Sequence, residues 1–146
     1  MALTRIAILL LLCPLAVADD RRAEVNYMLH CQGCHLPNAE GFDGRVPPMK
    51  DFVGYFLHSE EGRRFVVRVP GVAQSALSDT ELAELVNWML ATFSPDQLPE
   101  PFVPFTPEEV SNLRLDPEPD PDDTRVNILA SIATDIPELQ EALENH

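Results

Sequence analysis

The clearest periodic pattern in the chain covers residues 78–93. Large apolar side chains recur there every three or four positions, which is the spacing of one buried helix face: Leu82, Leu85, Val86, Met89, Leu90 and Phe93. Ser78 and Glu81 precede this stripe with the spacing of a capping box, in which each side chain accepts a hydrogen bond from the other residue's backbone. The pattern predicts an amphipathic helix that begins after Ser78, with Trp88 at the border of its apolar face.

Two shorter apolar stretches lie before that helix. Residues 52–57 follow Asp51, which can cap a short helix, although Gly54 lowers the helix propensity of the stretch. Residues 63–69 are rich in β-branched side chains and favour a strand by propensity, yet Phe65, Val66 and Val69 also fit a helical face. The dipeptide at 70–71, Pro-Gly, is predicted to end this stretch.

A first helix is predicted from Asp19 and Asp20, whose carboxylates suit the start of a helix. Val25, Met28 and Leu29 follow at i, i+3 and i+4, so we expect them to form its apolar face. The helix leads into residues 31–35, and a polar loop rich in turn-forming residues follows between positions 36 and 47.

Residues 1–18 have the features of a secretory signal peptide. Arg5 precedes an apolar run at 6–12, and Ala-Val-Ala at 16–18 provides a small-residue cleavage site. The run is too short to cross a bilayer, and no later stretch reaches the roughly 18 apolar residues of a transmembrane helix. We therefore expect a mature chain that starts at Asp19, has no membrane span and is secreted to the periplasm.

The charge is concentrated in the last third of the chain. The formal net charge is −14, and residues 19–93 carry −4 of it whereas residues 94–146 carry −11. Such a surface disfavours nucleic acid and anionic membranes as partners and favours proteins with basic docking patches. The charge can equally serve only to solvate a flexible tail.

We divide the chain into a signal peptide (1–18), a helical domain (19–93) and an acidic, proline-rich C-terminal extension (94–146). The composition of the extension predicts no compact core, so we expect a partly ordered strap followed by a mobile end. A second capping box at Thr106 and Glu109 predicts a short helix that can seat Val110 and Leu113 on the domain. Residues 122–132 can form another helix.

The candidate site is the sequence Cys-Gln-Gly-Cys-His at residues 31–35. On one helical turn Cys31, Cys34 and His35 stand at i, i+3 and i+4, so both thiols and the imidazole point to one side. The thiols can add to the two vinyl groups of a haem as thioethers, and a neutral His35 can bind the iron. Cys13 lies in the signal peptide, so the mature chain has no further cysteine with which to build a disulfide framework.

Two other uses of this cluster are weaker. A thioredoxin-like redox pair would follow an apolar strand within a βαβ pattern, and neither is present in the sequence. A structural zinc site needs four ligands, and His30, His58 and His146 do not stand at zinc-finger spacing.

Together these features resemble the class I c-type cytochromes, over residues 25–93. The likeness rests on the Cys-x-x-Cys-His motif and, less specifically, on the capped final helix with Trp88. It implies an all-α fold, a small helical domain around one covalently attached haem c, here followed by the acidic extension. It also implies that residues 63–69 form a short helix, that Cys31 and Cys34 carry the thioethers, and that His35 is the proximal iron ligand.

The resemblance raises a question about the sixth iron ligand. Pro47 matches the family's proline, whose carbonyl accepts the proximal imidazole N–H, and this match places Met49 on the same side of the haem. The family usually supplies a distal methionine a few residues before the last helix, but residues 71–77 contain none. The sixth ligand is therefore Met49, His58 or no protein side chain.

The expected function is that of an electron carrier, not an enzyme, which passes single electrons between periplasmic redox partners through the haem. One alternative is a haem-bearing subunit of a periplasmic dehydrogenase complex, docked through the acidic extension. Another is a haem protein whose open distal site binds small ligands or has weak peroxidatic activity.

Overall fold

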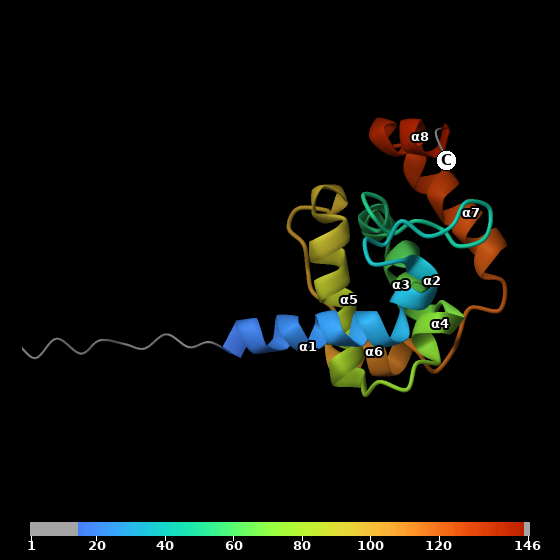
Figure 1. The fold of residues 1–146 in the computed structure, drawn as a ribbon. Helices are drawn as coiled ribbons and strands as arrows, with labels where there is room; N and C mark the ends of the chain where they lie inside the picture. Colours follow the sequence, from blue (N-terminus) through green and yellow to red (C-terminus); the bar gives the residue numbers. More distant parts are fainter. Residues whose placement is uncertain (1–14, 145–146) are drawn as a thin grey trace, which may run out of the picture.

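The computed structural model describes residues 15–144, which fold into a bundle of short helices (Figure 1). In chain order these are α1 (Leu15–His30), α2 (Gln32–His35), the 3₁₀ helix η1 (Val53–His58), α3 (Glu60–Arg68), α4 (Pro70–Ala73), α5 (Asp79–Phe93), the 3₁₀ helix η2 (Pro95–Gln97), α6 (Pro107–Leu113), α7 (Pro121–Ala133) and α8 (Pro137–Glu144). No β-strand forms within this part of the chain, where Phe42 and Val46 make an isolated bridge. The prediction of an all-α fold is confirmed.

Most of the expected signal peptide, residues 1–14, lies outside the described residues. Helix α1 begins at Leu15, so Asp19 and Asp20 lie inside the helix rather than at its start, contrary to the prediction. No helix between residues 15 and 144 is long and apolar enough to cross a membrane.

Helices α1 and α5 cross and pack against each other (Figure 1), but through a different face of α1 from the one predicted. Three residues expected on the apolar face are exposed by 46%, 55% and 72%, respectively: Val25, Met28 and Leu29. The buried face instead contains Ala23 and Tyr27, each 1% exposed. The Tyr27 ring centroid lies 5.7 Å from that of Trp88 and 4.9 Å from that of Phe93, and this aromatic contact decides which face of α1 is buried.

The predicted start and face of α5 are confirmed. The Ser78 hydroxyl accepts a hydrogen bond from the Glu81 amide, and the Glu81 carboxylate accepts one from the Ser78 amide at 3.0 Å. The apolar stripe is buried, with Phe93 half-buried at its end: Leu82, Leu85, Val86, Met89 and Leu90.

The two middle stretches are both helical. Residues 53–58 form η1 rather than a helix capped by Asp51, because Asp51 has a φ of 53° and Phe52 precedes the first turn. Gly54 is needed there, since its amide donates to the Ser94 hydroxyl at 2.9 Å and a Cβ would meet the Ser94 carbonyl oxygen at 2.8 Å. The helix implied for residues 63–69 is present as α3, and Pro70 then begins α4 as well as ending α3.

The C-terminal extension is part of the folded core. This corrects the expectation that the extension would form no compact core and would end in a mobile segment. Helices α6 and α7 form where short helices were expected, and α8 was not predicted. The extension buries six apolar side chains, each no more than 6% exposed: Phe105, Val110, Ile128, Leu129, Ile132 and Leu139. Composition did not predict this burial because a few well-spaced apolar residues are enough to order the extension when they can pack against a surface that the helical domain already forms.

Arginine side chains join the extension to the helical domain. Arg63 of α3 pairs with Glu109 at 2.7 Å and lies 3.9 Å from the centroid of the Phe105 ring. Because its carboxylate pairs with Arg63, Glu109 completes only half of the predicted second capping box. The Glu109 amide donates to the Thr106 hydroxyl, but the reciprocal bond to the Glu109 carboxylate does not form. Arg68 pairs with Glu118 at 3.4 Å, so part of the acidity of the extension is used within the molecule.

Arg114 forms the reverse connection, from the extension to the segment before α5. Its guanidinium donates to the carbonyl oxygens of Ala73, Ser75 and Leu77 at 3.0, 2.5 and 2.9 Å. It also pairs with the Asp79 carboxylate at 3.0 Å. This one side chain therefore holds the whole segment that connects α4 to α5.

Candidate haem-attachment site

The motif at residues 31–35 occupies one helical turn at the end of α1. The amides of Cys34 and His35 donate to the Cys31 carbonyl at 3.1 and 3.0 Å. The backbone therefore forms the helical turn on which residues at i, i+3 and i+4 stand on one side. Both cysteines are free thiols, with Cys34 exposed and Cys31 and His35 partly buried.

Burial tunes the protonation of two of these groups. It raises the pKa of the Cys31 thiol, and the neighbouring Cys34 adds to this effect. Burial also lowers the pKa of His35, while the backbone carbonyl of Pro47 acts in the opposite direction. A lowered pKa keeps the imidazole neutral at neutral pH, which is the form that binds a metal.

The two ring nitrogens of His35 have different surroundings. Nδ1 is buried and makes no hydrogen bond of good geometry, although the Pro47 carbonyl lies close enough to influence the ring. A histidine that ligates iron through Nε2 turns Nδ1 toward such an acceptor, which fixes its tautomer. The buried Nδ1 beside Pro47 therefore fits a proximal iron ligand.

A tight loop brings Pro47 to the motif. The Gly41 amide donates to the His35 carbonyl at 3.1 Å, and the Val46 amide donates to the Phe42 carbonyl at 2.8 Å. Gly41 has a φ of 67°, and a Cβ there would overlap the Val46 carbonyl oxygen and lie 2.9 Å from that of Pro47. Only glycine fits this close crossing of the chain.

Comparison with characterised proteins decides the family. Over 123 residues the chain is 32% identical to a cytochrome c-552 of Thermus thermophilus, in an alignment that covers 72% of the chain and 82% of the relative. The chain belongs to the class I c-type cytochromes. A second cytochrome c-552 of Thermus thermophilus is 31% identical over 102 residues, covering 58% of this cytochrome and 78% of the relative, and no protein-family model matches.

Membership of this family fixes the general chemistry. Such proteins carry covalently bound haem c, whose iron changes oxidation state by one electron, and this cytochrome acts in electron transfer with redox partners. The motif is the part of the chain with the donor set for that group, two thiols and one imidazole. Within residues 15–144, no three His, Cys, Asp or Glu side chains come together as ligands for a free metal ion.

The structure separates the two side chains considered as a sixth ligand. His58 is exposed, and its Nε2 lies 3.0 Å from the Gln97 carbonyl oxygen. Met49 is partly buried, and its amide donates to the carbonyl of Ala39 at 2.8 Å, in the loop that follows His35. Met49 thus belongs to the segment around Pro47, whereas His58 is engaged by η2.

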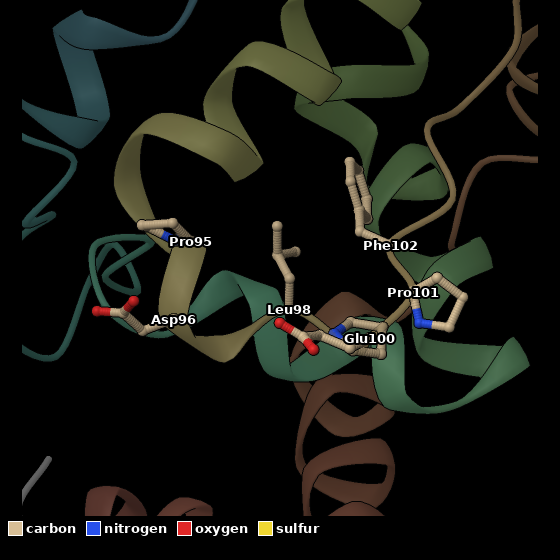
Figure 2. A pocket seen from close by; sticks show the side chains of 7 residues that line it. Pro95, Asp96, Leu98, Glu100, Pro101 and Phe102 are labelled. Atoms are coloured by element: carbon tan, nitrogen blue, oxygen red, sulfur yellow. The ribbon is translucent and has the colours of Figure 1, made fainter.

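A pocket of about 720 Å³ lies elsewhere, at the start of the extension, and is lined by η2 and the residues that follow it (Figure 2). Its lining alternates prolines and apolar side chains with two acids: Pro95, Asp96, Leu98, Pro99, Glu100, Pro101 and Phe102. None of these residues belongs to the motif or to the loop around Pro47. The pocket is therefore a feature of the extension.

The sequence interpretation missed two residues that shape the site, Tyr27 and Gly41. Tyr27 stands four residues before Cys31, one helical turn away, and that spacing was the available signal. Gly41 was recognised as a turn former, but the carbonyl groups that exclude a side chain there come from residues 46 and 47. No local pattern reveals such a crossing.

Proposed function

We propose that this cytochrome is a periplasmic electron carrier with one haem c, attached to Cys31 and Cys34 and ligated by His35. The observation that carries the proposal is the geometry of the motif: two free thiols and a neutral imidazole on one turn, with Nδ1 buried and the Pro47 carbonyl close to the ring. The predicted signal peptide supports export to an oxidising compartment.

The haem, when bound, supplies the one-electron chemistry. The chain supplies orientation and burial, which together set the reduction potential. His35 would hold the iron through Nε2, and a Pro47 carbonyl that accepts a hydrogen bond from Nδ1–H would make the imidazole more basic and favour the oxidised state. The loop closed by Gly41 keeps that carbonyl in place.

Partners with basic patches fit the surface of the extension. Although three of its carboxylates pair with Arg63 and Arg68, many others are exposed. These include Asp96, Glu100, Glu108, Asp120, Asp122, Asp123, Asp135 and Glu138. Association through such a surface should weaken as salt increases.

A second candidate function is the binding of small ligands at an open distal iron position. The placement of His58 against Gln97 and of Met49 beside the His35 loop favours it, as does the absence of methionine from residues 71–77. In that case the ferric protein lacks the weak long-wavelength band of methionine–iron ligation, shows high-spin character and binds cyanide readily. The presence of that band in the wild type, and its loss in Met49→Leu, would contradict this candidate.

The main proposal is tested by producing the full chain together with a cytochrome c maturation system. We expect one covalently bound haem per chain and a reversible one-electron redox titration. As a matched control, His30→Ala changes the exposed histidine next to Cys31 and should leave both results unchanged. A wild-type protein with haem that is lost in denaturant, or with no reversible redox couple, would contradict the proposal.

A further inference from the structure

The chain is forced through an unusual backbone conformation directly after the proposed iron ligand. Leu36 has a φ of 67° and Ala39 a φ of 60°, although neither is glycine. Such conformations persist only where surrounding contacts hold them, and they concentrate at functional sites. The contact that holds this turn therefore also determines the orientation of the His35 side chain.

Tyr27 supplies that contact. Its hydroxyl donates to the Leu36 carbonyl at 2.6 Å, and the Ala39 amide lies close enough to influence the Tyr27 hydroxyl. The Ala39 amide itself donates to the Leu36 carbonyl at 3.2 Å. The two residues with positive φ, Leu36 and Ala39, are therefore joined by a hydrogen bond to the same carbonyl oxygen that the Tyr27 hydroxyl contacts. Burial raises the pKa of Tyr27 to about 12, which keeps the hydroxyl protonated and able to donate at all physiological pH values.

The ring of Tyr27 is fixed independently of its hydroxyl. The residue is 1% exposed, and its ring packs against Trp88 and Phe93 of α5. Its carbonyl also accepts the Cys31 amide at 2.9 Å, so its own backbone continues the helix into the motif. Tyr27 thus connects a rigid helix pair to the residue that follows His35.

We propose that Tyr27 is a positioning residue for the iron ligand, and that its hydroxyl, through the Leu36 carbonyl, sets the orientation of the His35 imidazole. This inference rests on the proposed function, because it requires His35 to bind the iron. It assigns the ring and the hydroxyl different tasks: the ring stabilises the α1–α5 contact, and the hydroxyl orients the ligand.

The test compares Tyr27→Phe, which removes only the hydroxyl, with Phe93→Leu, which removes an aromatic contact and leaves the hydroxyl in place. The readout is the proton NMR spectrum of the cyanide-bound ferric holoprotein, in which the spread of the haem methyl shifts reports the orientation of the histidine plane. Thermal unfolding of both variants is measured alongside it, and so is the reduction potential.

We expect Tyr27→Phe to change the pattern of methyl shifts and to move the potential, while Phe93→Leu lowers the melting temperature with an unchanged pattern. An unchanged pattern in Tyr27→Phe would overturn the inference, and so would equal changes in both variants, because the ring contact alone would then set the ligand. A wild-type protein without haem methyl signals would instead overturn the proposed function, and the inference with it.

Discussion

The motif segment, residues 15–47, and the C-terminal extension, residues 94–144, are held in place by different kinds of contact. Hydrogen bonds between near neighbours, such as Tyr27 to Leu36 and Gly41 to His35, shape the turn around the motif, and Arg22 adds a long-range bond to Glu84. The extension is held in part by arginine hydrogen bonds between residues 35 to 48 positions apart, among them Arg63 to Glu109 and Arg114 to Asp79. The turn around the motif is therefore specified mainly by residues close in sequence, with Tyr27 held from α5, whereas the order of the extension depends on a surface formed elsewhere.

The largest effect should come from removing the extension. Truncation after Phe93 deletes the six buried apolar residues of the extension, and each contributes roughly 1.5–3 kcal/mol when fully buried. Their sum is comparable with the whole stability of a small domain, about 5–15 kcal/mol, so we expect loss of cooperative thermal unfolding as followed by circular dichroism.

A matched truncation after Ala133 removes α8 and only Leu139 from that set, and it should lower the melting temperature while leaving a cooperative transition. If the chain ending at Phe93 melted like the wild type, the extension would be a dispensable strap and not part of the folded core.

The next effect tests the motif segment, through Gly41. Gly41→Ala places a Cβ on the carbonyl groups of Val46 and Pro47 at a positive φ, and should destabilise the protein by about 2 kcal/mol or more. Gly44 has a φ of 68°, but a Cβ there would meet no neighbour within 4 Å, so Gly44→Ala should cost only about 1 kcal/mol. Denaturant titration measures both, and equal losses would show that the close crossing at Gly41 is not a constraint.

The smallest effect concerns pH and the ion pair that holds the extension. Hydrogen bonds from Ser111 and then Arg114 lower the pKa of Asp79 below its ordinary value of 3.8. The unfolded state therefore binds the proton more readily, and the stabilising contribution is present above that ordinary value and lost as the pH falls below it.

Asp79→Asn should accordingly flatten the acid limb of the stability curve between pH 5 and 2, a range set by about one unit above and two below the ordinary carboxyl pKa. The control Asp96→Asn, at an exposed carboxylate of η2, should leave the acid limb as it is in the wild type. If Asp79→Asn had the same acid limb as the wild type, the Asp79–Arg114 pair would not be one of the contacts that stabilise the extension.

What could be predicted from the sequence follows the same division. The capping box at Ser78 and Glu81 and the stripe of α5 are short-range patterns, and the structure reproduces them. Residues 31–35 likewise form the helical turn on which the spacing argument depends. The buried face of α1 was predicted wrongly because Tyr27 outweighs the apolar residues at other positions once Trp88 and Phe93 are its neighbours.

The extension shows the limit of composition as evidence. Its prolines and acids describe a solvated chain, yet Glu118 is 8% exposed and paired with Arg68, and Leu139 is completely buried. Whether an acidic residue faces solvent or an arginine depends on where distant helices place that arginine. No pattern within the extension contains this information.

Mass spectrometry of the proteolysed holoprotein shows directly whether residues 31–35 attach the haem. We expect the peptide containing Cys31 and Cys34 to carry the mass of one haem, with both thiols consumed, and a Cys31→Ala, Cys34→Ala double variant to yield no covalent haem. Recovery of that peptide from a haem-containing wild-type protein with both thiols free would contradict this expectation.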